Sequence, residues 1–459
     1  MSVLSWQFIL FVGIVFILSA FANNKLRKLI ILIANVFFVL SYGKLIHLIW
    51  LLMMIIYSYT MAFLIRKNRT KEMLIISLIP MILGLAFFKY CGLFGFTNIF
   101  MPLGLSFYTF KIISYLYDLY KKKIKRISLV DYAVYVSFFP VITAGPINRA
   151  KSFVEQLNAP YRFDYTTAKN GAVLCGFGMF QKMVFADYLG MVCNNAFASE
   201  AKGASLIFAV VLYAFYIYLD FDGYSNIAIG ISNMLGFKID RNFKTPYLAS
   251  SIMQFWDRWH ISLSSWLKDY IYIPLGGNRK GTMRKYVNIM IVFIISGIWH
   301  GSTLVFVIWG IGHGIVNIIE NMIKASFKEI KWPVMIAGIG RIFGILINFM
   351  IVSLLWVFFR SGSMSEAFTI IKGMMDISGW QIDHEVLGLT IKELYWLWVI
   401  IMITIITDIM RNKTNMIEWL AKRNFIIRWS VYIIMIFVTM IFGVYGPGYD
   451  ASDFIYAIF

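Results

Sequence analysis

Long apolar stretches separated by short polar ones recur along almost the whole chain. A helix that crosses a bilayer needs about 20 consecutive, mostly apolar residues. Apolar runs that approach or reach this length occupy residues 5–22, 29–43, 46–65, 73–95, 168–197, 204–219, 286–300, 303–323, 335–359, 393–410 and 426–445. The pattern predicts an all-α polytopic membrane protein with about eleven spanning helices.

Two shorter apolar pieces, at 101–118 and 129–147, are broken by proline and glycine. The breaking residues are Pro102, Gly104, Pro140, Gly145 and Pro146. Irregular backbone is tolerated at membrane depth only where protein or a water-filled cavity covers it. We therefore expect one membrane domain, residues 1–459, whose core encloses a cavity.

Clusters of lysine and arginine mark one side of the membrane. They lie at 25–28, 66–71, 121–126, 279–285 and 411–423. Cytoplasmic loops of membrane proteins carry an excess of Lys and Arg, so we expect these clusters on the cytoplasmic side. No cation precedes the run at 5–22, whereas a signal peptide carries its cations first. We expect this run to be a retained span with its N-terminus outside. Asp450 and Asp453, in a terminal stretch without Lys or Arg, also fit the outside.

Composition supports the membrane prediction and narrows the chemistry. The chain is 60% hydrophobic and 14% charged, which excludes an ordinary soluble domain. Its net charge of +19 fits cytoplasmic loops better than nucleic-acid binding, because no basic block is interleaved with stacking aromatics. Three cysteines without a Cys-x-x-Cys pair argue against disulfides and zinc, so no metal is expected.

Residues 251–270 carry aromatic and apolar side chains at helical spacing. Charged residues such as Asp257, Arg258, Lys268 and Asp269 fall mostly between them. We expect one amphipathic helix that lies at the membrane interface or lines the cavity.

His300 stands out among the five histidines. It lies at the end of an apolar run, 15 residues after Lys285, the last cation of its loop. A straight helix would lift it about 22 Å into the membrane. An imidazole at that depth could move a proton at a functional cavity or bond between helices, and its position alone favours neither.

The other histidines and two aspartates leave alternatives open. His260 lies on the aromatic face of the amphipathic segment, where an aromatic belt explains the tryptophans but not the histidine. His313 has small neighbours that favour a packing role. Asp220 and Asp222 could form a transporter's proton site, but we favour structural partners for Arg or Tyr. His47 and His384 are more readily incidental; phosphate-loop, Gly-x-Ser-x-Gly and His-x-x-x-His motifs are absent.

Several motifs together resemble one known family. The segment from Phe255 to Arg279, with Trp-Asp-Arg-Trp-His and Ile-Pro-Leu-Gly-Gly-Asn, strongly resembles the signature of the membrane-bound O-acyltransferases. It looks most like the branch of bacterial alginate O-acetylation proteins. Further similar segments are Pro102–Phe110, Ser137–Arg149, Leu219–Gly230, Ser296–Gly301 and Phe454–Tyr456. The resemblance therefore extends along nearly the whole chain.

The resemblance implies a fold and a site. The fold would be the family's helical bundle, with re-entrant and interfacial helices around a central cavity and a catalytic core at about 100–323. The family's catalytic histidine corresponds to His300, and its second polar residue, 40 positions earlier, corresponds to His260. The cavity would be lined by Trp256, Arg258, Trp259, Asp269, Tyr270, Asn278, Trp299 and His313.

The implied reaction moves an acetyl group from cytosolic acetyl-CoA to an acceptor outside the bacterial plasma membrane, for polysaccharide O-acetylation. Acetyl-CoA is strongly anionic, and Arg279, Lys280, Arg284 and Lys285 form a basic mouth that could receive its phosphates. His300 would act as general base, while His260 orients the acceptor or holds the oxyanion. No cofactor would be bound permanently, and an SGNH-type partner outside the membrane would complete the transfer to sugar.

Two other functions remain as alternatives. The first is D-alanyl transfer to teichoic acid from a carrier-protein thioester, within the same superfamily. The second is a polysaccharide or ion transporter that uses Asp220 and Asp222 as its coupling site.

Overall fold

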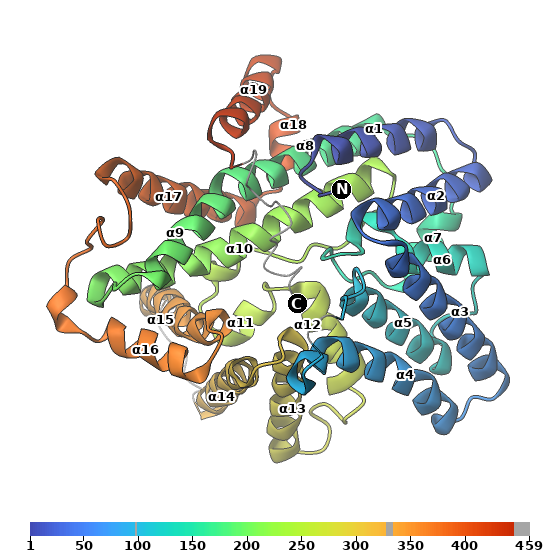
Figure 1. The fold of residues 1–459 in the computed structure, drawn as a ribbon, viewed down its shortest axis with the longest axis horizontal. Helices are drawn as coiled ribbons and strands as arrows, with labels where there is room; N and C mark the ends of the chain where they lie inside the picture. The colour runs from blue at the N-terminus through green and yellow to red at the C-terminus, as the bar shows by residue number, and fades with distance from the viewer. Residues whose placement is uncertain (97–98, 327–333, 445–459) are drawn as a thin grey trace. The chain divides into compact units, whose positions relative to one another are not determined.

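A computed structural model describes residues 1–96, 99–326 and 334–444, and over these ranges the chain is helical with no strand (Figure 1). Each of the eleven predicted apolar runs forms helix over most of its described residues. The run at 168–197 forms one continuous helical stretch, in which the π-helix η3 (Gln181–Ala186) joins α8 (Tyr165–Phe180) to α9 (Asp187–Ala198). The all-α prediction is confirmed. The acidic C-terminal stretch and Phe454–Tyr456 lie outside the described residues.

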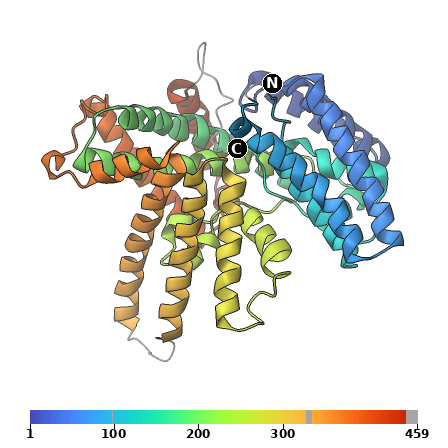
Figure 2. The same ribbon diagram turned by 60° about the horizontal axis from the view of Figure 1, so that its bottom comes forward.

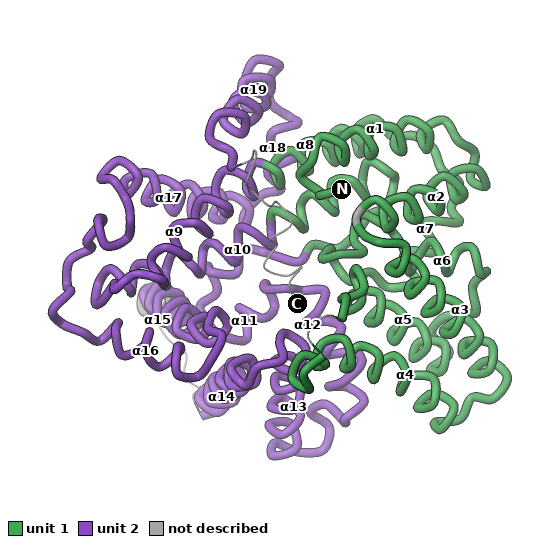
Figure 3. Tube along the Cα trace, in the orientation of Figure 1, with its two compact units in different colours: residues 1–179, 223–241, 446–459 green, residues 180–222, 242–445 purple. Residues whose placement is uncertain are grey.

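The chain divides into two compact units, shown in Figure 3. Unit 1 comprises residues 1–179, 223–241 and 446–459, and unit 2 comprises residues 180–222 and 242–445. Helix α10 (Gly203–Met234) contributes residues to both. The prediction of a single domain with its core at about 100–323 remains a prediction.

Unit 1 is built from helices packed around the two glycine- and proline-rich segments. Its helices before α8 are α1 (Trp6–Ala20), α2 (Asn24–Tyr42), α3 (Leu45–Lys67), α4 (Lys71–Tyr90), η1 (Cys91–Phe94), α5 (Leu105–Tyr120), α6 (Leu129–Ser137), η2 (Phe139–Val141) and α7 (Ala150–Asn158). Gly104 begins α5 with φ +69°, and the carbonyl oxygen of Ile142 occupies the place of a Cβ. A glycine is required there because the backbone is left-handed and the neighbouring segment lies so close.

Unit 2 contains α9 and most of the C-terminal half of the chain. Its later elements are η4 (Pro246–Leu248), α11 (Ile252–Trp256), α12 (Ile261–Leu267), η5 (Lys268–Tyr272), α13 (Thr282–His300), α14 (Leu304–Ser326), α15 (Val334–Arg360), α16 (Met364–Met374), η6 (Ile377–Gly379), α17 (Ile391–Lys413), α18 (Met416–Ala421) and α19 (Phe425–Phe442). Helices α13, α14 and α15 stand side by side (Figure 2).

Seven helices within the described residues are long and apolar enough to cross a membrane. They comprise α3, α4 with η1, α10, α14, most of α15, α17 and α19. Helix α19 buries none of its apolar window, and many large apolar side chains of α1, α15 and α17 are exposed. Exposed apolar surface on this scale needs lipid as its solvent. The expected total of eleven crossings remains a prediction.

Several helices begin directly after a residue whose side chain caps the helix N-terminus. Ser5, Asn23, Thr70, Ser128, Ser363 and Asn424 each accept a hydrogen bond from a backbone N–H in the first turn of the following helix. Helix α17 begins with a complete capping box, in which Thr390 and Glu393 each bond the other's backbone N–H. Such bonds satisfy N–H groups that have no partner within the helix.

Candidate active site

His300 is the last residue of α13, and the glycines around it allow two helices to meet. Its neighbour Gly301 is extended, and the ring of Phe306 occupies the place of a Gly301 Cβ. One turn earlier, Gly297 faces the carbonyl oxygen of Phe306, and Gly310 of α14 faces that of Phe293. The glycines of the Ser-Gly-Ile-Trp-His-Gly motif therefore let α13 and α14 approach closely while His300 stays at the buried end.

The His300 ring is 2% exposed and lies among aromatic rings. Ring centroids lie 4.6 Å away for Trp299, 5.0 Å for Trp309 and 5.2 Å for Phe359. These rings exclude bulk water from the imidazole, which can serve as a general base for a hydroxyl group that comes within hydrogen-bond reach.

The amphipathic segment departs from the single helix expected over 251–270. Helix α11 ends at Trp256, and α12 begins only after His260, whose φ is +42°. Two backbone hydrogen bonds explain the break: Lys244 N–H donates to Arg258 C=O at 2.9 Å, and Ile261 N–H donates to Asn242 C=O at 2.8 Å. The expectation of one continuous helix was wrong, because pairing with a distant segment outweighs local helical propensity.

The break turns the His260 side chain into the core, where it is fully buried. Its ring lies edge-on to Phe221 at 4.8 Å and 6.3 Å from the Trp299 ring. This residue lies outside the seven candidate spans, and burial lowers its pKa to about 3. His260 is therefore neutral near pH 7.

His313 joins the same group of rings from α14. It is fully buried, its centroid is 5.0 Å from Trp309, and its Nδ1 accepts a hydrogen bond from Trp256 Nε1 at 3.3 Å. Trp299 thus contacts both His260 and His300, while Trp309 contacts both His300 and His313. The structure brings these three histidines into one cluster, together with Trp256, Trp299, Trp309 and Phe359. We call it the histidine cluster.

The remaining expected cavity residues occupy different positions. Trp259 is buried and packs against Trp356 at 4.9 Å. Arg258 is half-buried and donates to the Thr245 carbonyl at 3.4 Å. Asp269 and Tyr270 lie half-buried in the π-helix η5, where the Tyr270 ring is tilted against the Trp266 ring, with centroids 5.2 Å apart. Asn278 is exposed in the following loop.

The four basic residues lie at the opposite end of α13 from His300. Arg279, Lys280 and Arg284 are exposed, and the half-buried Lys285 donates to Asn321 Oδ1 at 2.5 Å. The 15 residues of α-helix from Lys285 to His300 span about 22 Å. Helix α13 thus carries cations at one end and a buried imidazole at the other.

Sequence reasoning missed Trp309 and Phe359 of the histidine cluster, and also Trp356, which packs against Trp309 from outside the cluster. Trp309 precedes His313 by four residues, so the helical period of α14 could have identified it. Trp356 and Phe359 belong to α15, and their ring centroids lie 5.8 and 5.2 Å from that of Trp309. Nothing in the local sequence pattern connects α15 to the cluster.

Asp220 and Asp222 lie in the middle of α10, and both are buried in ion pairs. Lys182 contacts Asp220 and Asp187 at 2.5 Å each. Arg411 contacts Asp222 at 2.6 Å and Asp408 at 3.7 Å. Gln181 Nε2 also donates to Asp222 at 3.1 Å, and Tyr218 OH donates to Asp408 at 2.8 Å. We call these eight residues the charged cluster. The π-helix η3 supplies Gln181 and Lys182, which the sequence pattern did not connect to the aspartates.

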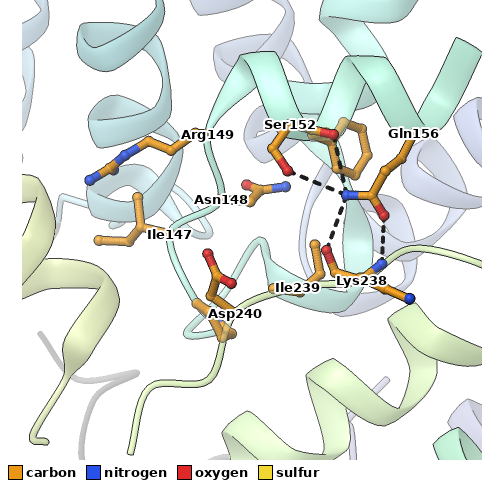
Figure 4. A pocket seen from close by; sticks show the side chains of 10 residues that line it. Ile147, Asn148, Arg149, Ser152, Gln156, Lys238, Ile239 and Asp240 are labelled. Atoms are coloured by element: carbon orange, nitrogen blue, oxygen red, sulfur yellow. Dashed lines mark hydrogen bonds between the residues drawn. The ribbon is translucent and has the colours of Figure 1, made fainter.

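Unit 1 has a small hollow of its own, shown in Figure 4. It is lined by residues 146–149, 152, 153 and 156 and by residues 238–240. Gln156 bonds Ser152 and the Lys238 backbone at its edge. Four residues of the Gly-Pro-Ile-Asn-Arg motif, 146–149, therefore line this hollow.

Within the described ranges, no group of three or more His, Cys, Asp or Glu side chains is arranged to hold a metal ion.

The sequence matches a known protein family and several relatives. Residues 35–360 match the model of the MBOAT, membrane-bound O-acyltransferase family. The "Probable alginate O-acetylase AlgI" of Pseudomonas putida is 32% identical over 387 residues, 79% of this chain and 76% of that protein. The "Peptidoglycan O-acetyltransferase" of Helicobacter pylori is 33% identical over 418 residues, 80% of this chain and 78% of that protein. The "Teichoic acid D-alanyltransferase" of Streptococcus thermophilus is 27% identical over 291 residues, 58% and 69% of the two chains. This multi-pass membrane chain therefore belongs to the membrane-bound O-acyltransferase family and is an acyltransferase.

Proposed function

We propose that this protein transfers acetyl groups from cytosolic acetyl-CoA to an extracytoplasmic acceptor, for O-acetylation of a polysaccharide at the bacterial plasma membrane. The observation that carries the proposal is α13, with exposed cations at one end and buried His300 at the other. Relatives named for acetylation of alginate and peptidoglycan support the acetyl group and the polysaccharide.

His300 acts as general base in the proposed reaction. Its imidazole takes the proton of the acceptor hydroxyl, whose oxygen attacks the thioester carbonyl carbon. The carbon–sulfur bond then breaks, and the thiolate receives the proton from the imidazolium. His260, neutral and held by Phe221 and Trp299, orients the acceptor hydroxyl.

The remaining residues serve binding. Arg279, Lys280, Arg284 and Lys285 receive the phosphates of acetyl-CoA at the cytosolic face. The cavity between donor and acceptor is lined by Trp256, Arg258, Trp259, Asp269, Tyr270, Asn278, Trp299 and His313. Acetyl-CoA is a substrate rather than a resident cofactor, and an SGNH-type partner outside the membrane passes the acetyl group to the sugar.

Specific observations favour this function over the two alternatives. The teichoic acid relative matches a smaller share of the chain, at lower identity, than the acetylation relatives do. Both aspartates of the transporter alternative are held in ion pairs with Lys182 and Arg411. Buried carboxylates paired in this way are typical of structural networks.

The test is acetyl-CoA turnover by the purified protein in nanodiscs, with wild type compared with His300→Ala. Radiolabelled acetyl-CoA is supplied together with an acceptor polysaccharide fraction and, separately, with water alone. We expect turnover in wild type and loss of at least about 1,000-fold in His300→Ala, as for removal of a catalytic group. His384→Ala is the matched control. His384 lies in a polar loop, where its Nδ1 forms a hydrogen bond with the backbone carbonyl of Leu389, five residues later.

Other outcomes would redirect the proposal. Turnover that persists in folded His300→Ala would remove His300 from the chemistry. Turnover of a carrier-protein thioester but not of acetyl-CoA would support D-alanyl transfer. Substrate flux without acyl transfer, abolished by Asp222→Asn, would support a transporter.

A further inference from the structure

Two buried N–H groups of the histidine cluster have no acceptor among the described residues. They are Nε1 of Trp309 and Nε2 of His313, one helical turn apart on the same face of α14. Both side chains are fully buried, and their ring centroids are 5.0 Å apart. Folded proteins satisfy nearly all buried donors, so two neighbouring exceptions call for an acceptor of another origin.

The tautomer of His313 makes its Nε2 a donor. Trp256 Nε1–H donates to His313 Nδ1 at 3.3 Å, so Nδ1 presents a lone pair. A neutral imidazole whose Nδ1 accepts carries its proton on Nε2. The Trp256 indole therefore fixes His313 with an N–H group directed away from Trp256.

These donors lie beside His300. Trp309 lies edge-on to His300, with centroids 5.0 Å apart and planes at 84°. The surrounding rings include Trp256, Phe293 and Trp356, and such an apolar setting strengthens any hydrogen bond made within it. Neutral N–H donors suit an oxygen that is uncharged in the substrate and becomes negative only in the transition state.

We propose that Trp309 and His313 form an oxyanion site beside His300. Their two N–H groups donate to the carbonyl oxygen of the acyl thioester. This inference rests on the proposed function, since it assigns the oxygen to the thioester that His300's reaction consumes.

The step balances with groups already named. The acceptor oxygen forms a bond to the carbonyl carbon, the carbonyl π electrons move onto the oxygen, and His300 holds the hydroxyl proton. Hydrogen bonds from Trp309 and His313 stabilise the resulting oxyanion. When the carbonyl re-forms, the carbon–sulfur bond breaks, and the thiolate leaves with the proton from His300.

The decisive variant is Trp309→Phe, which removes the N–H group and keeps an aromatic ring. We expect kcat for acetyl transfer to fall by about 100- to 1,000-fold, the effect of losing one oxyanion-site donor. KM for acetyl-CoA should change by less than about threefold, because the bond strengthens in the transition state. The melting temperature should fall less than in Trp356→Phe, because both substitutions remove the same buried volume but only Trp356 loses a hydrogen bond made in the folded protein.

Trp356→Phe is the matched control. Trp356 contacts Trp309 at 5.8 Å, but its Nε1 already donates to Tyr247 OH at 3.1 Å. Removing that bond should lower the melting temperature and leave kcat within about threefold of wild type. The two variants thus make the same substitution in adjacent rings and predict opposite patterns.

His313 provides the second arm. His313→Gln keeps an N–H donor on a flexible side chain, whereas His313→Leu removes it. We expect the glutamine variant to retain at least about tenfold more kcat than the leucine variant. Equal kcat in the two variants would remove His313 from the oxyanion site.

The outcomes separate this inference from the proposed function. A kcat of Trp309→Phe close to that of wild type would overturn the oxyanion site while leaving the function intact. Lost kcat together with a melting temperature lowered as far as in Trp356→Phe, as for a structural water bonded to Trp309, would also overturn it. Wild-type protein that consumes no acetyl-CoA would refute the proposed donor, and the oxyanion site with it.

Discussion

The charged cluster and the histidine cluster differ in how far their buried polar groups find partners. In the charged cluster, Asp220 and Asp222 each contact a cation within 2.6 Å. In the histidine cluster, aromatic rings surround His300, and two neighbouring N–H groups lack an acceptor among the described residues. Both clusters belong to unit 2.

The difference shows how burial can be read for function. Ionised groups that contact each other at short range secure helices, because removing one partner leaves the other charged and dry. A polar group that folding leaves without an acceptor lowers stability and is retained where a ligand supplies the missing bond. Phe221 connects the two clusters, because it lies between Asp220 and Asp222 in sequence and packs edge-on to His260.

The largest contrast comes from His300→Gln, which keeps a polar side chain of similar size. We expect acetyl transfer to fall by at least about 1,000-fold, because glutamine cannot take the acceptor's proton. The melting temperature should change less than the activity, since glutamine keeps a polar side chain of similar size at this buried position. Turnover and thermal unfolding are measured on one preparation. If the variant lost both turnover and thermal stability, His300 would be needed for folding rather than for the chemistry.

Asp222→Ala should produce the reverse pattern. It leaves Arg411, whose side chain is 18% exposed, without its closest carboxylate, and we expect about 3–5 kcal/mol of lost stability. The double variant Asp222→Leu with Arg411→Met should recover most of that loss. Asp376→Ala is the control, because its exposed partner Lys202 lies 3.7 Å away and such pairs contribute about 1 kcal/mol or less. Unfolding in detergent that showed equal losses for Asp222→Ala and Asp376→Ala would contradict the distinction.

His260 makes the stability of the fold depend on pH. Its pKa is about 3 in the folded protein, against 6.5 for an ordinary histidine, because burial disfavours the charged ring. The unfolded chain therefore binds more protons as pH falls below 6.5, and stability is lost on acidification. Between pH 7.5 and pH 5 this single residue should reduce the free energy of unfolding by about 2 kcal/mol. The check is the difference between wild type and His260→Gln at each pH; parallel curves would exclude the effect.

The smallest effect should come from the exposed cations, which belong to neither cluster. We expect Lys280→Ala or Arg284→Ala to raise KM for acetyl-CoA by about tenfold at low salt, with kcat within about twofold. The effect should shrink as ionic strength rises, because salt screens exposed charges. Lys422→Ala, in another loop, serves as control. An equal rise in KM for the control would indicate a general effect of net charge.

The hydrophobic pattern was sufficient to predict the helices but not their interruptions. Spans such as α3 and α14 were recognisable because length and apolar content are local properties. The break at His260 was not, because hydrogen bonds to Asn242 and Lys244 depend on chain that lies at least 14 residues away. The resemblance pointed to His260 and His300, yet spacing along the chain does not reveal that both touch the Trp299 ring.

The sequence by itself therefore determined the class of protein and the residue types available for acyl transfer. Only the tertiary structure decided which polar groups acquire partners. Lys182 and Arg411 reach Asp220 and Asp222 from η3 and α17, whereas the N–H groups of Trp309 and His313 meet no acceptor in the described chain. The physical reason is that hydropathy is a property of each residue, whereas satisfying a buried polar group depends on atoms brought close by folding.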